Sequence, residues 1–307
     1  MDPSNRYFKQ VQLLVSVIPV VAKQECFALK GGTAINLFVR DLPRLSVDID
    51  LVYLPKQERN DALAGINAGL NAIQVELNKR PGYRVSAVTM AGDGSDIRLI
   101  VETVNATIKI EVNPVLRETV HPPKIGRVRD SVEKWFGFAE MPVVDFNDLY
   151  AGKLCAALDR QHPRDLFDTM QLLESDGIST ELKNTFLVYL LSHPRPIAEV
   201  LAPNHLDIES VYENEFRGMT TDPVELDALL QARVDVIDEI HQKLTDVDRK
   251  FLLGFKSGRP DWSLFAYPNA ENLPAIRWKM KNLKDLSVEN AEKHKAAVEK
   301  LAAILNR

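Results

Sequence analysis

Cysteine is scarce in this chain of 307 residues, which contains only Cys26 and Cys155. The two thiols are far apart in the sequence, and each lies among apolar residues. Two isolated cysteines supply neither the framework of a disulfide-rich protein nor the ligand spacing of a zinc site. We therefore expect both thiols to be buried and reduced, as in a cytoplasmic protein.

Long apolar runs and an excess of one charge are also lacking. The apolar stretch 11–22 is short and interrupted by Pro19, and no basic segment leads into it, so we expect neither a signal peptide nor a membrane span. Lysine and arginine number 38 against 43 aspartates and glutamates, which gives a net charge of −5. No overall field attracts a polyanion, so any contact with nucleic acid has to come from a local patch.

A glycine pair, Gly31-Gly32, follows the short apolar run 27–29 and precedes Thr33. This order predicts a strand, a sharp turn and a helix that opens at Thr33. The free N–H groups and the positive dipole end of a helix start favour an anion, and glycines let a phosphate come close. We expect Gly31, Gly32 and Thr33 to hold the triphosphate of a nucleotide.

Two carboxylates share one face of the next predicted strand, residues 46–54. Apolar and other residues alternate there, so Asp48 and Asp50 lie on the face opposite Val47, Ile49 and Leu51. Two residues along a strand span roughly 6.6 Å, so both side chains could reach a common pair of magnesium ions. Like charges this close repel unless a cation or basic neighbours are present. The alternative is an edge strand with an acidic, solvated outer face.

These residues resemble a known signature. Gly32-Thr33 with Asp48-x-Asp50 is similar to the Gly-Ser and Asp-x-Asp motifs of the DNA polymerase β-like nucleotidyltransferases. The longer string, Lys30-Gly-Gly-Thr-Ala with Arg44-x-Ser46-x-Asp48-Ile-Asp50-Leu, resembles the bacterial abortive-infection toxins of the AbiEii/AbiGii type. Thr33 stands where the superfamily usually has serine, and the spacer is a few residues long. The resemblance implies that Arg44 and Ser46 also contact the nucleotide.

A third carboxylate is expected on the predicted strand 107–112. Lys109 and Glu111 share the face opposite Ile108, Ile110 and Val112. In nucleotidyltransferases of this type, an acid on a neighbouring central strand completes the metal site and can accept the proton of the attacking hydroxyl. Glu111 matches that position by order and strand context. The alternative pairs Glu111 with Lys109, or with a base on a neighbouring strand, as an exposed ladder.

Two further motifs are expected on a helical hairpin. Lys153 and Arg160 are seven residues apart on one predicted helix face, and a second helix opens at Pro163. Lys153-Leu154 with Arg164-Asp165-Leu166-Phe167-Asp168 resembles later motifs of the same toxin family, which implies that Lys153 and Asp165 face the nucleotide. A lysine there would offset charge on the departing pyrophosphate, and Asp165 could hold Lys153 or Arg164, or bind the sugar. The alternative is a set of salt bridges between helices, and Asp168 fits either role.

The other predicted elements frame these motifs. Helices are expected at 4–24 and 58–79, and strands at 83–90 and 97–103. The basic segment 117–134 is expected to be a loop and a candidate domain junction, with His121 as a loop histidine. Later helices are expected at 180–191, 224–244 and 288–305, with a loop at 254–262.

One later segment carries positive charge around an aromatic ring. Arg277, Lys279, Lys281 and Lys284 surround Trp278 and could contact RNA, or form an ordinary solvated helix face.

The length and the 45% of apolar residues allow two modest domains or one large one. We expect an α+β chain: a nucleotidyltransferase domain over residues 1–140, with a small mixed sheet, and a helical domain over 141–307 that closes over the nucleotide.

The expected function is a metal-dependent nucleotidyltransferase. Asp48, Asp50 and Glu111 are expected to bind two Mg²⁺ ions, with Mn²⁺ as an alternative, and an NTP to lose pyrophosphate in an in-line displacement. The family resemblance implies a cytoplasmic bacterial toxin, a tRNA 3′ end as acceptor and a separately encoded antitoxin. The same constellation also adenylylates small molecules, so a small-molecule acceptor stays open, as does a non-catalytic nucleotide-binding protein.

Overall fold

The computed structural model describes residues 5, 7–89, 97–113 and 119–306. The chain forms two compact units. The first consists of Met1–Leu149 together with Phe216–Val224, and the second of Tyr150–Glu215 together with Glu225–Arg307. The chain therefore passes between the units three times.

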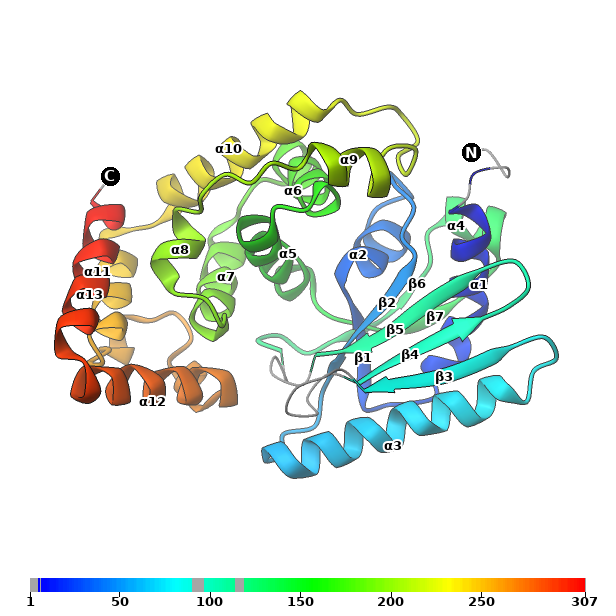
Figure 1. Ribbon diagram of the computed structural model, residues 1–307, viewed down its shortest axis with the longest axis horizontal. Helices are drawn as coiled ribbons and strands as arrows, with labels where there is room; N and C mark the ends of the chain where they lie inside the picture. Colours follow the sequence, from blue (N-terminus) through cyan, green and yellow to red (C-terminus); the bar gives the residue numbers. More distant parts are fainter. Residues whose placement is uncertain (1–4, 6, 90–96, 114–118, 307) are drawn as a thin grey trace. The chain divides into compact units, whose positions relative to one another are not determined.

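A mixed sheet of seven strands is the centre of the first unit, in the order β3-β4-β5-β2-β1-β7-β6 (Figure 1). The pairs β2–β5 and β1–β7 are parallel, and the other neighbours are antiparallel. The strands are β1 (Phe27–Lys30), β2 (Asp48–Tyr53), β3 (Arg84–Thr89), β4 (Ile97–Glu102), β5 (Thr107–Val112), β6 (Lys124–Arg127) and β7 (Glu140–Val143). This arrangement confirms the expected mixed sheet and α+β class.

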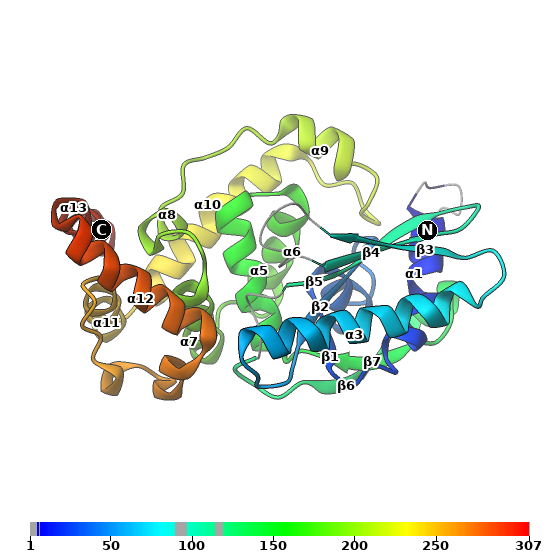
Figure 2. The same cartoon turned by 60° about the horizontal axis from the view of Figure 1, so that its bottom comes forward.

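Two long helices, α1 (Phe8–Val21) and α3 (Arg59–Asn78), pack on one face of this sheet. α3 contacts β3 and β4, α1 contacts β5 and β7, and the two helices contact each other. Figure 2 shows α3 running alongside the sheet. The alternation of β2 and β5 explains the choice of face, because Ile49, Leu51, Ile108 and Ile110 are buried while the residues between them in each strand are more exposed.

The segment after the glycine pair differs from the expected helix that opens at Thr33. Helical structure starts at Gly31, as the single turn α2 (Gly31–Thr33), and continues without a break into the π-helical segment η1 (Ala34–Val39). Gly31 has a φ of +73°, which suits a residue without Cβ. Short π-helical segments are rare and recur at functional sites.

The segment 117–134 also differs from the expected loop. In its described part it contains β6, which pairs with β7 at the edge of the sheet, and the helix α4 (Asp130–Phe136). β6 has only four residues, and its Ile125 is 70% exposed, so the strand lacks the apolar alternation that would have predicted it.

The second unit is helical in its described part. Its first helix, α5 (Phe146–Arg160), starts in the first unit. The other elements are α6 (Pro163–Ser175), α7 (Thr180–Ser192), α8 (Ile197–Leu201), α9 (Glu209–Glu215), α10 (Leu226–Lys243), α11 (Asp246–Lys256), η2 (Trp262–Leu264), η3 (Pro268–Asn272), α12 (Pro274–Glu289) and α13 (Ala291–Leu305).

Two of the predicted elements in this unit have different limits. The single helix expected over 288–305 is divided at Asn290, whose side chain accepts a hydrogen bond from the N–H of Lys293 and so caps α13. The loop expected at 254–262 begins later, because α11 continues to Lys256. Within the described residues, no helix combines the length and the apolar character needed to cross a membrane.

A buried ion pair joins α7 and α11. Lys183 Nζ lies 2.6 Å from Asp248 Oδ2, and the two side chains are 7% and 11% exposed. The same Asp248 oxygen accepts hydrogen bonds from the N–H and the hydroxyl of Thr245, which closes a capping box at the start of α11. The carboxylate therefore stabilises both the helix start and the contact between the helices.

We expect Lys183→Met to lower the free energy of unfolding by about 3 kcal/mol, because it leaves a buried carboxylate without its cation. Urea denaturation followed by circular dichroism measures the change. Lys300→Met, which removes an exposed lysine of α13, is the control and should change stability by less than about 0.5 kcal/mol. Equal stability of the Lys183→Met protein and the wild type would contradict this account.

Candidate active site

The three predicted acidic residues lie on one face of the sheet. β2 and β5 are parallel neighbours, and their register aligns Asp50 with Glu111 and Asp48 with Lys109. Aligned residues of neighbouring strands project to the same side. Asp48, Asp50 and Glu111, here called the carboxylate face, therefore project away from α1 and α3, and each is half-buried. The register therefore places the two aspartates and the glutamate on the same face of two neighbouring strands.

Basic residues flank the carboxylate face at the same register. Arg98 on β4 is aligned with Glu111, and Lys30 on β1 is aligned with Asp50. Arg98 Nε lies 2.5 Å from Glu111 Oε1, with side-chain exposures of 28% and 35%. Glu111 thus has a cross-strand basic partner, one of the alternatives that the sequence left open. Within the described residues, the Asp50 carboxylate takes part in no hydrogen bond or ion pair.

The surroundings of Glu111 disfavour the charged form of its carboxyl group. Burial raises the pKa of its carboxyl group, the positive charge of Arg98 lowers it, and the negative charges of Asp50 and Asp48 raise it again. The net pKa is above the usual value of a glutamate. A cation near this face would relieve the repulsion among the three acids.

The glycine pair is in close contact with the polar side chains around it. A Cβ on Gly31 would collide with Asp50 Oδ2, and one on Gly32 would lie 2.6 Å from Arg44 Nη2 and 3.1 Å from Ser46 Oγ. Glycine at these two positions therefore leaves room for the side chains of Asp50 and Arg44, whether or not a phosphate is bound. The sequence had suggested only the approach of a phosphate, and the structure adds this second reason.

Thr33, Ser46 and Asp48 connect the turn to the start of β2. Thr33 Oγ1 lies 3.0 Å from Ser46 Oγ and 2.5 Å from the carbonyl oxygen of Asp48. Asn36 Nδ2 donates to the carbonyl oxygen of Gly32 at 2.9 Å. Arg44 is only 2% exposed, so its guanidinium supports the turn from inside the fold.

The segment 216–224 returns from the second unit and holds the loop that carries Arg44. The N–H of Leu45 donates to the carbonyl oxygen of Met219 at 2.7 Å, and the N–H of Thr221 donates to that of Pro43 at 3.2 Å. A β-bridge pairs Arg44 with Thr220. These contacts use backbone atoms, so no side-chain pattern in the sequence indicated them.

The predicted residues of the helical hairpin form a buried ion cluster in the second unit. Lys153 Nζ lies 2.9 Å from Asp165 Oδ1 and 2.9 Å from Asp168 Oδ2, and all three side chains are at most 5% exposed. Arg160 donates to both oxygens of Asp165, at 2.5 and 3.1 Å. Arg164, the other expected partner of Asp165, instead lies 3.7 Å from Glu215 Oε2.

The charges of this cluster control the ionisation of Asp165. Burial alone would raise the pKa of this carboxyl group, but the charges of Lys153 and Arg160 and their hydrogen bonds hold it well below its usual value. His162 caps α6 by accepting a hydrogen bond from the N–H of Arg164.

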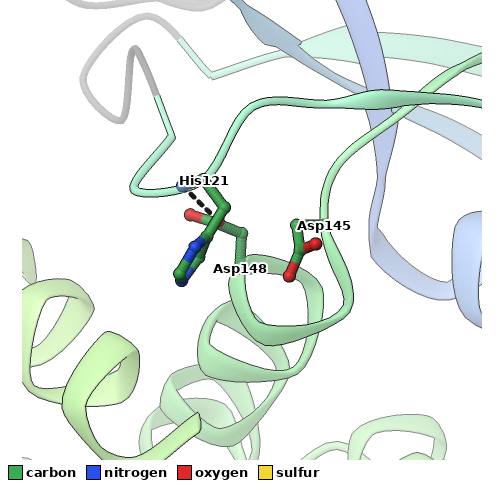
Figure 3. Close-up of side chains that lie close together, drawn as sticks. All are labelled: His121, Asp145 and Asp148. Carbon is green, nitrogen blue, oxygen red and sulfur yellow. Dashed lines mark hydrogen bonds between the residues drawn. The ribbon is translucent and has the colours of Figure 1, made fainter. Parts of the chain in front are cut away.

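A second group of potential metal ligands consists of His121, Asp145 and Asp148 (Figure 3), with one ligand atom of each within 4.8 Å of the others. This group could hold a divalent cation. Both Asp148 oxygens, however, accept backbone N–H groups, from Val120 at 2.7 Å and from His121 at 2.9 Å.

Asp145 is also engaged in this group. It accepts hydrogen bonds from the backbone and side chain of Asn147, and its other oxygen lies 3.4 Å from Lys124 Nζ. These aspartates therefore already hold the loop at 120–121 and the start of α5. Among the described residues, the Asp50 carboxylate has no such partner, which distinguishes the carboxylate face from this group.

The basic segment around Trp278 is only partly the surface that the sequence suggested. Trp278 is 62% exposed, and Lys281 Nζ lies 5.5 Å from its ring centre. Lys279 instead donates to the carbonyl oxygens of His193 and Arg195, at 2.5 and 2.8 Å. Burial, together with the smaller effect of the nearby charge of Lys256, lowers the pKa of Lys279 to about 8. Lys279 therefore donates hydrogen bonds to the backbone that follows α7 and does not belong to the exposed basic surface.

Comparisons with known proteins agree with this geometry. A profile of the family described as "Nucleotidyl transferase AbiEii toxin, Type IV TA system" matches residues 12–282. A search among curated protein sequences finds no match. Among solved structures the chain is similar to MenT4, a nucleotidyltransferase toxin from Mycobacterium tuberculosis H37Rv, with a TM-score of 0.60 and 14% identity over 90% of this chain and 93% of that one.

The likeness in structure shows the fold of a nucleotidyltransferase toxin, which confirms the expected fold class. The family match extends over both units and includes the glycine pair, the carboxylate face and the ion cluster around Lys153. The chain therefore belongs to the AbiEii family of nucleotidyltransferase toxins of type IV toxin–antitoxin systems.

Proposed function

We propose that this toxin transfers a nucleoside monophosphate from an NTP to the 3′ end of a tRNA in the bacterial cytoplasm, with release of pyrophosphate. The observation that carries the proposal is the alignment of Asp50 with Glu111 on the same sheet face as Asp48, next to the glycine turn. The family also implies an antitoxin as the partner of the chain.

The carboxylate face suits Mg²⁺ or Mn²⁺. Both ions prefer oxygen ligands, and Asp50 has an unengaged carboxylate beside Asp48 and Glu111 among the described residues. We propose that these three acids bind two divalent ions, as in the two-metal sites of polymerases. A bound ion would supply polarisation of the α-phosphate and of the attacking hydroxyl.

The chain's own residues would bind and orient the nucleotide. The N–H groups at Gly31, Gly32 and Thr33 begin a helix, where backbone donors favour phosphate oxygens. Arg44 and Ser46 contact the space beside Gly32 and are both buried. We propose that they act on the nucleotide by fixing this turn. Glu111 would accept the proton of the acceptor hydroxyl, because its raised pKa brings it closer to neutral pH.

We propose that Asp165 holds Lys153 in the position in which it acts on the nucleotide. The Lys153 ammonium is compensated by two carboxylates at 2.9 Å, so most of its charge is already balanced. We propose that Asp165 fixes Lys153 and Arg160 in the orientation from which the Lys153 amine contacts the phosphates that leave. Asp168 shares this task of holding Lys153.

An exposed basic and aromatic surface supports an RNA acceptor. Trp278 offers a ring on which a base could stack, with Lys281 beside it and the exposed side chains of Arg277 and Lys284 on the same helix α12. This arrangement suits a single-stranded end. The net charge of −5 makes such a local patch necessary for binding RNA.

Transfer can be measured with each α-³²P-labelled NTP, Mg²⁺ and total tRNA. We expect one or more of the labels to appear in tRNA, and periodate oxidation of the tRNA 3′ end beforehand to abolish labelling. The added mass identifies the nucleotide and its number. If label appears only in small molecules, the acceptor is a small molecule and not RNA. If no NTP gives any transfer, the proposal is overturned.

We expect Asp48→Ala and Asp50→Ala each to reduce transfer at least about 10³-fold while the protein stays folded. Removing one of several repelling carboxylates does not destabilise the sheet, but it removes a metal ligand. Glu102→Gln is the matched control, because Glu102 lies on the same face of β4 as Arg98, four residues further along the strand, and should keep near-normal transfer. Activity of Asp50→Ala close to wild type would remove Asp50 from the mechanism.

We expect Asp165→Asn to lower the free energy of unfolding by about 3–5 kcal/mol at pH 7, because it breaks a buried ion cluster. The pKa of Asp165 is depressed in the folded state, so its stabilisation is present above about pH 4 and is lost as the pH falls below that value.

Urea denaturation between pH 3 and 7 tests this expectation. The pH dependence below pH 4 should be weaker in Asp165→Asn than in the wild type. Asp238→Asn, at an exposed position on α10, should keep the wild-type profile. Parallel profiles of Asp165→Asn and the wild type would show that Asp165 is not the group concerned.

A further inference from the structure

Four charged residues form a row across the strands of the first unit. The register aligns Arg98 on β4 with Glu111 on β5, Glu111 with Asp50 on β2, and Asp50 with Lys30 on β1. The row therefore reads positive, negative, negative, positive on one sheet face. Lys30 precedes the glycine turn, whereas Arg98 lies on the opposite side of the two acids and belongs to none of the motifs found in the sequence.

Arg98 is in a position to neutralise Glu111. Its Nε lies 2.5 Å from Glu111 Oε1, and both side chains are about one-third exposed, so water screens the pair only partly. Glu111 therefore has a positively charged partner before any other cation binds.

Two opposing electrostatic effects would determine the affinity of the carboxylate face for a divalent cation. Asp48, Asp50 and Glu111 attract it, while the fixed charge of Arg98 repels it and engages one oxygen of Glu111. Three carboxylates without Arg98 would bind the ion more tightly. A nucleotide triphosphate adds negative charge beside the glycine turn and shifts the balance back toward binding.

We propose, on the basis of the proposed function, that Arg98 is a built-in counter-cation that lowers the affinity of the nucleotide-free protein for a divalent metal. Metal then binds tightly only together with the triphosphate of an NTP. Arg98 is a positioning residue in this scheme, because it acts on the metal through Glu111. The full-length toxin would thus take up metal and nucleotide as one complex.

The test measures Mn²⁺ binding to the full chain without nucleotide, by electron paramagnetic resonance of the free ion. We expect Arg98→Met to bind Mn²⁺ at least about fivefold more tightly than the wild type, because one repelling unit charge is removed. Arg98→Lys should stay within about twofold of the wild type, because it keeps the charge. Arg98→Gln, a polar and neutral replacement, gives the same comparison should the methionine variant fail to fold.

Arg84→Met is the matched control. Arg84 on β3 is aligned with Glu102 on β4, so this cross-strand pair of arginine and glutamate lies on the same face and outside the row. Its loss should leave the Mn²⁺ affinity unchanged. Arg98→Met should have a smaller effect in a Glu111→Gln background, because only the direct repulsion between Arg98 and the ion then remains.

Unchanged or weaker Mn²⁺ binding by both neutral Arg98 variants would overturn the inference, since Arg98 would then orient Glu111 for the metal. That result leaves the proposed function intact if the wild type still transfers nucleotides. The proposed function itself fails if the wild type transfers no nucleotide and binds no Mn²⁺ in the presence of a non-hydrolysable NTP.

Discussion

The parallel pairing of β2 with β5 is the constraint on which the candidate site depends. A one-residue change of this register would move Glu111 to the face under α1 and α3 and separate it from Asp48 and Asp50. The register is fixed by burial, because Ile49, Leu51, Ile110 and Val112 pack on the helical side. The apolar half of each strand thus positions the acidic half, and the route through α3, β3 and β4 brings β5 next to β2.

Charge balance is the second requirement of this face. Acids held side by side on a sheet are unfavourable unless cations compensate them, and the row from Arg98 to Lys30 provides equal numbers of each sign. The second unit uses the same principle differently. Lys153 and Arg160 balance the charge of Asp165 within the cluster, whereas Asp50 keeps an unengaged carboxylate among the described residues. The contrast is the physical reason for proposing that the sheet face binds metal and that the hairpin holds Lys153 in position.

The sequence predicted those features that depend on local patterns. Alternation identified β2 and β5 and the face of Glu111, and helical spacing placed Lys153 and Arg160 on one side of α5. It did not predict Arg98, because a cross-strand partner follows from register and not from spacing along the chain. β6 was missed because it has four residues and an exposed Ile125, and 216–224 because it binds through its backbone. The metal and nucleotide roles of the predicted residues stay predictions.

The glycine turn connects these findings. Gly31 is pressed against Asp50, Gly32 against Arg44, and the loop carrying Arg44 is held by Met219, Thr220 and Thr221. A side chain at either glycine would displace a residue of the carboxylate face or its support, independently of any bound phosphate. The glycine turn and the carboxylate face are therefore packed directly against each other. This contact gives a physical reason for finding both motifs in one short stretch of the chain, since a side chain in the turn would displace Asp50 or Arg44.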